Sequence, residues 1–326
     1  MKTALRNRLA PLVSFRRGSV RTACFVALAF LASAAVLAGA ASAQTPAQGT
    51  VQLRAGQQVI LVTGSTDGMG REIARRLAEG GAHVIVHGRN RERGAALVRE
   101  IETAGKGSAR FYAADLASLA EVRSFAAAIL QDYPRLNVLV NTAGIWLALP
   151  PERQLSADGH EMHFAVNYLA GYALTHLLLP RLIASAPARI VNVSSGAQAP
   201  IDFEDLKLEQ NYNPTRAYSI SKLAQVMFTV DLAEQLEGTG VTVTALHPAT
   251  MMDTNLVREG GLSPRSTVAE GAEAVLQLVN APGIASGQYY NGLVPGRANA
   301  QAYDPEARSR LRALSQTLTG IPAATR

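Results

Sequence analysis

The stretch Thr63-Gly64-Ser65-Thr66-Asp67-Gly68-Met69-Gly70 decides the fold. It follows an apolar run over 59–63 and precedes an amphipathic pattern over 71–79. The apolar run is typical of a strand buried on both faces, and the pattern after it indicates a helix. A glycine-rich turn between strand and helix lets the backbone approach a pyrophosphate, whose charge then faces the positive end of the helix. This stretch therefore predicts a nucleotide site at the first strand–helix junction.

The same alternation continues along the chain. Short runs rich in Val and Ile predict strands over 59–63, 82–87, 110–113, 137–141, 189–193, 241–246 and 288–290. Amphipathic patterns predict helices over 71–79, 119–131, 160–184, 219–237 and 270–279. Repeated strand–helix alternation favours one α/β domain over 57–326, with helices on both faces of a single doubly wound parallel sheet of about seven strands.

A second motif, Tyr218-Ser219-Ile220-Ser221-Lys222, follows the first by about 150 residues. A tyrosine has an unperturbed pKa of about 10, too high for efficient acid–base work near neutrality. A lysine four residues later lies one helical turn on and on the same face. Its positive charge favours the phenolate, so we expect Lys222 to lower the pKa of Tyr218. The motif predicts a proton-transfer site with Tyr218 as general acid/base.

Two further motifs lie between these, Asn141-Thr142-Ala143-Gly144 and Val193-Ser194-Ser195. With all four in this order, the chain resembles the short-chain dehydrogenase/reductase family from about residue 57 to 320. The resemblance implies a Rossmann-like fold, a nicotinamide cofactor and hydride transfer between an alcohol and a carbonyl. It also implies catalytic roles for Tyr218 and for three more residues: Lys222, which also holds the nicotinamide ribose; Ser195, which orients the substrate oxygen; and Asn167, which positions a water beside the lysine.

The end of the second predicted strand selects the cofactor. An acidic residue there would bind the 2′-hydroxyl of NAD, whereas an arginine accommodates the 2′-phosphate of NADP. The sequence reads Val86-His87-Gly88-Arg89-Asn90-Arg91, so we expect NADP(H), with Arg89 as the selecting residue and a solvated surface arginine as the alternative. The expected cofactor-binding residues are Gly64, Ser65, Thr66, Gly68, Met69, Gly70, Arg89, Asp115, Leu116, Asn141, Ala143, Gly144, Tyr218, Lys222, Pro248 and Met251.

Three positions depart from the family pattern. Thr142 stands where the family usually has a second asparagine, and we expect its hydroxyl to bond the backbone locally. Ala249 follows Pro248 where a glycine is usual, and Thr254 comes one residue later than the family's threonine. Cofactor binding should survive these departures, and the geometry of the loop near Met251 and Met252 is left open.

The substrate side resembles one branch of the family. The segment Ile201-Asp202-Phe203-Glu204-Asp205-Leu206 and two stretches of the tail, 286–290 and 304–320, resemble retinol-dehydrogenase-like members, which favour lipophilic alcohols and aldehydes. The expected substrate class is a small-molecule alcohol, aldehyde or ketone. An apolar pocket is expected from Trp146, Leu147, Leu149, Met251, Met252 and Leu256, with plain core packing as the alternative. His160 and His163 are three residues apart, but no third ligand accompanies them, so no metal site is expected and a place at the surface or pocket rim is favoured.

The first 43 residues read as a targeting leader. They contain six basic and no acidic residues, an Arg16-Arg17 pair, an apolar run over 23–40 and a small-residue cleavage site at 41–43. We expect a signal peptide over 1–43, with twin-arginine export to the periplasm, followed by a linker over 44–56. The alternative is an uncleaved anchor, because the apolar run approaches the roughly 20 residues that span a bilayer.

Charge and cysteine content exclude several classes of function. Beyond the leader, 25 basic residues balance 25 acidic ones, so the net charge of +6 does not indicate a nucleic-acid-binding face. Cys24 is the only cysteine, and cleavage of the leader would remove it, which excludes thiolate chemistry in the mature chain. Two functions remain: an NADP(H)-dependent oxidoreductase, or a nucleotide-binding sensor or scaffold without turnover. The sequence leaves the substrate, the reaction direction and the oligomeric state open, and a homo-oligomer is one of the possible states.

Overall fold

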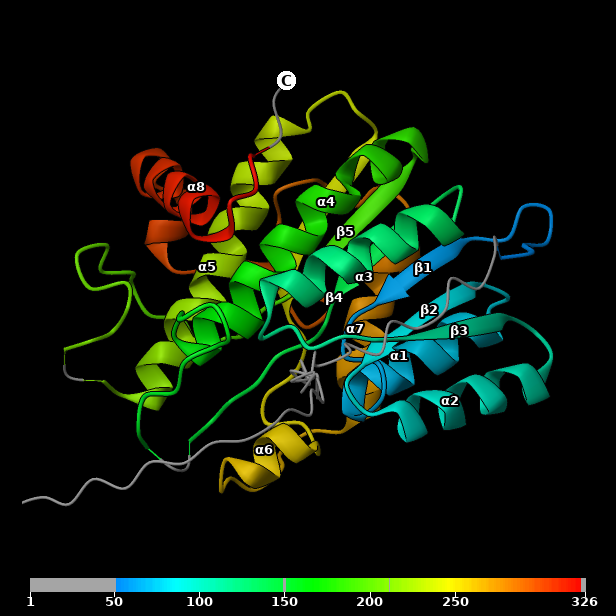
Figure 1. The fold of residues 1–326 in the computed structure, drawn as a ribbon, viewed down its shortest axis with the longest axis horizontal. Coiled ribbons are helices and arrows are strands. Elements are labelled where there is room, and N and C mark those ends of the chain that lie inside the picture. Colours follow the sequence, from blue (N-terminus) through cyan, green and yellow to red (C-terminus); the bar gives the residue numbers. More distant parts are fainter. Residues whose placement is uncertain (1–50, 149–150, 211, 324–326) are drawn as a thin grey trace, which may run out of the picture. The chain divides into compact units, whose positions relative to one another are not determined.

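The computed structural model of the protein describes residues 51–148, 151–210 and 212–323. Its centre is a sheet of eight strands in the order β3-β2-β1-β4-β5-β6-β7-β8 (Figure 1). Strands β1 to β7 pair in parallel, and β8 pairs antiparallel with β7. The strands are β1 Val59–Val62, β2 His83–Gly88, β3 Ser108–Ala113, β4 Val138–Asn141, β5 Ala188–Val193, β6 Val241–His247, β7 Tyr289–Asn291 and β8 Val294–Gly296.

Helices cover both faces of the sheet (Figure 1). They are α1 Gly68–Glu79, α2 Arg91–Ala104, α3 Leu119–Asp132, α4 Ala170–Ala184, α5 Pro214–Gln235, α6 Asn255–Glu259, α7 Val268–Asn280 and α8 Pro305–Thr319, with a π-helical turn η1 Phe164–Leu169 and a 3₁₀ turn η2 Ala300–Tyr303. The predicted doubly wound α/β domain is therefore confirmed.

Strand β1 shows why its sequence is apolar without interruption. Val59 and Leu61 pack into the core beneath α3, α4 and α5, whereas Ile60 and Val62 pack into the core beneath α1, α2 and α7. Successive side chains of a strand point to opposite faces, so a strand covered on both sides needs an apolar residue at every position. All four residues are fully buried.

The strand order reverses between β1 and β4. The chain runs from β1 outward through β2 and β3, then returns to place β4 on the other side of β1. Ligands of such sheets bind outside the carboxyl ends of the strands at this reversal, where the two loops diverge. The loops after β1 and β4 carry the first two sequence motifs, so the topology brings them together.

Several element boundaries differ from the sequence prediction, and one short strand was missed. Helix α5 begins at Pro214 rather than at residue 219, because Asn213 caps it by accepting the Arg216 N–H and proline suits the first helical position. The single helix predicted over 160–184 is instead the π-helical turn η1 followed by α4. The short strand β8 was missed, since its three residues include a proline and a glycine and it forms only by hairpin pairing with β7.

The predicted leader lies outside the described residues. Residues 51–56, the last part of the predicted linker, are described. Val51 donates its N–H to Asp132 O, and Val51 and Leu53 pack against the core. Across the part of the chain that the structure describes, no helix is both long and apolar enough to cross a bilayer.

Candidate active site

The glycine-rich loop between β1 and α1 is closely packed. Gly64 has φ +64°, and a Cβ there would lie 2.8 Å from Ala143 Cα in the loop after β4. A Cβ at Gly70 would lie 2.3 Å from Gly64 O, so a side chain at either position requires the backbone to move. Asp67 caps α1 by accepting the Gly68 N–H. The loop thus presents bare backbone at a helix N-terminus, as a pyrophosphate site requires.

Ser65 and His87 support this loop from behind. The fully buried Ser65 hydroxyl donates to Val62 O at 2.7 Å and accepts the His87 N–H at 2.9 Å. The His87 Nδ1 accepts the Gly64 N–H at 3.1 Å, and its Nε2 donates to Ala114 O at 3.2 Å. Burial lowers the pKa of His87 to about 4, which keeps the imidazole neutral, as these two bonds demand. The Ser65 side chain therefore holds the loop and does not face its open side.

The other residues expected around the adenosine half differ in exposure. Arg89 directly follows β2, is exposed, and makes no hydrogen bond or ion pair within the described ranges. The Thr66 side chain packs directly against Gly88, because a Cβ at Gly88 would lie 2.5 Å from the threonine hydroxyl. Asp115 is half-buried beyond β3 and accepts the Ala117 N–H. The side chains of Leu116 and Met69 are buried in the core, which leaves only their backbones for a ligand.

The loop after β4 is held from three sides. Asn141 is buried and donates to Asn192 Oδ1 at 2.8 Å and to Thr175 Oγ1 at 3.1 Å. The Thr63 hydroxyl accepts the N–H groups of Thr142 and Ala143. The expectation that the Thr142 hydroxyl bonds the backbone is wrong: this oxygen is buried and has no hydrogen-bond partner among the described residues.

The four residues with expected catalytic roles converge beside this loop. Tyr218 lies in α5 and is half-buried, with its hydroxyl hydrogen-bonded to Ser195 just beyond β5. A Cβ at Gly144 would lie 3.4 Å from both Lys222 Nζ and Asn167 Oδ1, so both groups lie against the loop after β4. The tertiary structure therefore assembles the predicted constellation.

The two adjacent serines have different environments. Ser194 is buried and donates to Lys222 O at 2.7 Å, so its hydroxyl is committed to α5. Ser195 is half-buried, and its hydroxyl reaches Tyr218 while also accepting the Ala197 N–H at 3.1 Å. The structure thus leaves the second serine of the pair facing the proposed proton-transfer group.

The protonation of Tyr218 and Lys222 differs from the sequence expectation. Burial raises the pKa of Tyr218, and the hydrogen bond with Ser195 only partly opposes it. Burial lowers the pKa of Lys222 to about 7. The lysine Nζ donates to Val193 O and to Gln225 Oε1, both at 3.0 Å, and lies 5.6 Å from the centre of the tyrosine ring. The expected lowering of the tyrosine pKa by Lys222 is therefore wrong for this structure, because desolvation dominates.

Asn167 lies in the π-helical turn η1 and is buried. Its Oδ1 accepts the Ile145 N–H at 2.7 Å, while its Nδ2 donates to Ile145 O at 3.1 Å and to Ser221 Oγ at 2.9 Å. Asn167 therefore joins the loop after β4 to α5 between Gly144 and Tyr218. π-Helical turns occur frequently at functional sites.

The segment after β6 contains one residue with an unusual backbone conformation. Met251 has φ +49°, a conformation that residues other than glycine rarely adopt, and Pro248 before it is buried. This left-handed residue lies in the segment where the threonine comes one position late. Thr254 still reaches the glycine-rich loop, since a Cβ at Gly68 would lie 3.2 Å from its methyl group.

Of the residues expected to line an apolar pocket, one lies beside the proposed proton-transfer group. Trp146 lies 5.9 Å, ring centre to ring centre, from Tyr218. Met252 instead packs against the core beneath α7, because a Cβ at Gly271 would lie 2.2 Å from its sulfur. Leu149 lies outside the described residues.

The structure also corrects and extends the set of residues near Tyr218. His163 is fully buried beside a buried Glu161, not at the surface or a pocket rim. Sequence reasoning missed Glu161 and Gln225, the amide that binds Lys222. Gln225 lies three residues after Lys222, on the same face of α5, and this spacing was the available signal.

Comparisons with known proteins agree with this arrangement. The family model described as short chain dehydrogenase matches residues 58–262. Retinol dehydrogenase 11 of Homo sapiens is 38% identical over 287 residues, covering 84% of this chain and 88% of the human protein. Retinol dehydrogenase 12 of Bos taurus is 39% identical over 278 residues, covering 81% and 87%.

Solved structures show the same fold. A metagenomic short-chain oxidoreductase in complex with NADP matches with a TM-score of 0.57 and 28% sequence identity, covering 73% of this chain and 96% of that one. Because a family model spans more than half of the chain and relatives above 35% identity span most of it, the protein belongs to the retinol-dehydrogenase-like branch of the short-chain dehydrogenase/reductase family.

Proposed function

We propose that the protein is an NADP(H)-dependent oxidoreductase that interconverts a lipophilic alcohol with its aldehyde or ketone. The observation that carries this proposal is the convergence of Tyr218, Ser195, Lys222 and Asn167 beside the loops after β1 and β4. These are the groups that a carbonyl reduction needs next to a nucleotide site.

The residues of the nucleotide site fit NADP(H). The backbone around Gly64 and Gly70 excludes side chains, and α1 directs its N-terminus toward the loop, which suits a pyrophosphate. Arg89 is exposed beyond the end of β2, where a 2′-phosphate would lie. The NADP-bound structural relative supports the same cofactor for this chain.

The bound nicotinamide would supply or accept the hydride, and the chain's own residues manage the proton. During reduction, the Tyr218 hydroxyl donates its proton to the substrate oxygen as negative charge develops there. Ser195 holds that oxygen by a hydrogen bond in the same position. Burial favours the neutral phenol of Tyr218, so the group is ready to act as an acid near neutrality.

Lys222 and Asn167 support the tyrosine. Lys222 Nζ lies near enough to the tyrosine ring to stabilise a phenolate once the proton has left. Asn167 holds the loop after β4 against α5 by its hydrogen bonds to Ile145 and Ser221. The lipophilic substrate class rests on the similarity to retinol dehydrogenases and on the indole of Trp146 beside Tyr218.

Replacement of Tyr218 by phenylalanine tests this function. Loss of the proton donor should reduce NADPH-dependent reduction of a lipophilic aldehyde by a factor of about 10² to 10⁴, with the dissociation constant of NADPH unchanged. Tyr303→Phe, which removes a hydroxyl that accepts the Ala298 N–H, serves as the control. Turnover at the wild-type rate in the Tyr218→Phe protein would refute the mechanism, and absence of turnover in the wild type with NADPH still bound would favour a sensor or scaffold.

We also propose that residues 1–43 direct export and that the mature chain begins near Gln44. An export route for folded proteins would carry the bound cofactor along. Mass spectrometry of the protein isolated from its own compartment reads the N-terminus and any bound nucleotide together. A chain with its leader intact in the membrane fraction would instead establish a tethered enzyme.

A further inference from the structure

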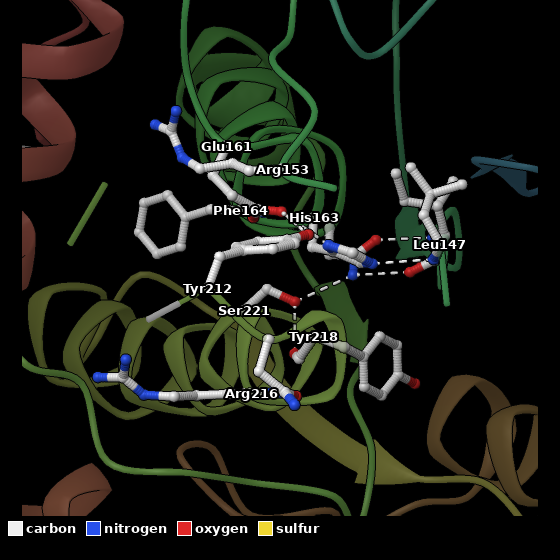
Figure 2. Close-up of polar contacts among 12 residues, drawn as sticks. Leu147, Arg153, Glu161, His163, Phe164, Tyr212, Arg216, Tyr218 and Ser221 are labelled. Carbon is white, nitrogen blue, oxygen red and sulfur yellow. Dashed lines mark hydrogen bonds and ion pairs between the residues drawn. The ribbon is translucent and has the colours of Figure 1, made fainter. Parts of the chain in front are cut away.

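A buried acid–imidazole pair lies beside Tyr218 (Figure 2). His163 is 0% exposed and Glu161 is 2% exposed, and His163 Nδ1 lies 2.7 Å from Glu161 Oε1. The other ring nitrogen, Nε2, accepts the Leu147 N–H at 2.9 Å. A peptide N–H can only donate, so Nε2 carries no proton and the Nδ1–H faces the carboxylate. The imidazole is therefore neutral and its tautomer is set by Glu161.

Glu161 organises three donors at once. Besides His163, it accepts the Phe164 N–H at 2.8 Å and the Tyr212 hydroxyl at 3.2 Å (Figure 2). Burial opposes ionisation of Glu161, whereas the hydrogen bonds from His163 and from backbone N–H groups favour the charged carboxylate. The carboxylate is therefore charged and links the start of η1 to the segment that precedes α5.

Asn167 and the Glu161–His163 pair form hydrogen bonds with alternate residues of the loop after β4. Asn167 binds the backbone of Ile145, and His163 binds the backbone of Leu147. Trp146 lies between these two clamped residues, and its indole contacts Tyr218 on one side. The indole also reaches the end of α6, where a Cβ at Gly260 would lie 2.8 Å from Trp146 Cε3.

The imidazole also contacts the tyrosine directly. The rings of His163 and Tyr218 meet edge to face, with centres 6.4 Å apart and planes at 86°. A buried ion and its partners cost solvation, and apolar residues of similar volume often stabilise a fold as well or better. Positioning of the groups that the pair binds is therefore a better account of it than stability.

We propose that Glu161 and His163 are positioning residues that set Trp146 as the wall of the substrate pocket against Tyr218, with Tyr212 coupling this wall to the segment before α5. The proposal rests on the function proposed above for Tyr218. It assigns substrate selection by size to Trp146, because a long apolar chain on the substrate must lie against the indole, whereas a short one need not.

The chain offers a direct probe, since Trp146 is its only tryptophan. The variants are Glu161→Gln, in which an amide N–H₂ faces a donor in place of a carboxylate oxygen, and Tyr212→Phe, which deletes only the outer link. Tyr212 is half-buried, so Tyr212→Phe keeps the proposal testable if Glu161→Gln fails to fold. The full chain is assayed for NADPH-dependent reduction of decanal and of propanal, with tryptophan emission and acrylamide quenching recorded in parallel.

Glu161→Gln should lower kcat/KM for decanal roughly 10- to 100-fold and for propanal less, because misplacement by about 1 Å costs rate at that scale. Tyr212→Phe should lower kcat/KM for decanal about 3- to 10-fold. Both should shift the Trp146 emission to longer wavelength and increase its quenching, while the dissociation constant of NADPH stays unchanged. The matched controls are Glu270→Gln, which alters a carboxylate that accepts the Thr267 N–H in the capping box of α7, and Tyr303→Phe.

Wild-type tryptophan emission and quenching in both variants would overturn the proposal, even if thermal stability fell, since the pair would then be merely structural. Equal losses for decanal and propanal would also overturn it. If the wild-type protein reduces neither aldehyde, the proposed function fails, whereas the tryptophan measurements still decide the positioning role.

Discussion

Replacement of Lys222 by methionine should change how stability depends on pH. The buried amine has its pKa lowered from 10.5 to about 7 in the folded protein. Between these values the unfolded chain binds a proton at Lys222 that the native chain does not. Stability of the wild type therefore rises with pH in this window by about 1.4 kcal/mol per unit. Below pH 7 both states are protonated, and the burial of the charge costs about 5 kcal/mol.

The prediction concerns how the difference in stability between the wild type and Lys222→Met changes with pH, not its sign at one pH. Methionine removes the buried charge but also leaves Val193 O and Gln225 Oε1 without their donor, at about 1–3 kcal/mol each. These losses do not depend on the titration of the amine. They therefore change the difference in unfolding free energy between the two proteins by the same amount at every pH. From pH 7 to pH 9, the wild type should gain about 3 kcal/mol relative to Lys222→Met.

Urea denaturation of the cofactor-free proteins at pH 6, 7, 8 and 9 measures this difference. NADPH is omitted, because a ligand of the native state would stabilise the wild type by mass action. Lys207→Met, which removes an exposed amine, controls for the loss of one positive charge. A difference in unfolding free energy that stays constant from pH 6 to 9 would refute the lowered lysine pKa.

Three further outcomes follow from the site geometry. Gly70→Ala should weaken NADPH binding at a cost of roughly 1–3 kcal/mol, since its Cβ would lie 2.3 Å from Gly64 O; unchanged affinity in a fluorescence titration would contradict this. Arg89→Ala should raise the KM for NADPH by about 10- to 100-fold and spare any activity with NADH, and equal losses with both cofactors would remove Arg89 from the 2′-phosphate site. Ser195→Ala should lower kcat by a factor of about 10² to 10³. Ser194→Ala should chiefly lower the free energy of unfolding, by about 1 kcal/mol. Steady-state kinetics and calorimetry on both variants check this, and a larger loss of kcat in Ser194→Ala would contradict it.

The sequence predicted the parts of the site that short-range chemistry dictates. Gly64 and Gly70 are needed because neighbouring backbone lies within 3 Å of where a Cβ would be, and such constraints leave a recognisable spacing. The Tyr218–Lys222 spacing is readable because four residues span one helical turn. The doubly wound sheet was readable from apolar runs that need cover on both faces.

The boundaries and environments were less accessible. Helix α5 starts five residues before its predicted start, and the π-helical turn η1 looks like ordinary helix in the sequence. The start of α5 is fixed by a local cap, in which Asn213 accepts the Arg216 N–H, whereas the Asn167 side chain of η1 binds Ile145, 22 residues away in the sequence. The strand β8 has no apolar pattern of its own and exists only through pairing with β7.

The sequence alone determined the family, the order of the motifs and the residue types at the proton-transfer site. Only the tertiary structure decided their electrostatics: burial overrides the expected effect of Lys222 on the pKa of Tyr218. It also joined Glu161 and His163 to Leu147 and Tyr212, which the chain supplies from separate segments. Spacing along a helix is a local property, whereas desolvation and hydrogen bonds between distant segments depend on what the whole fold places around each group.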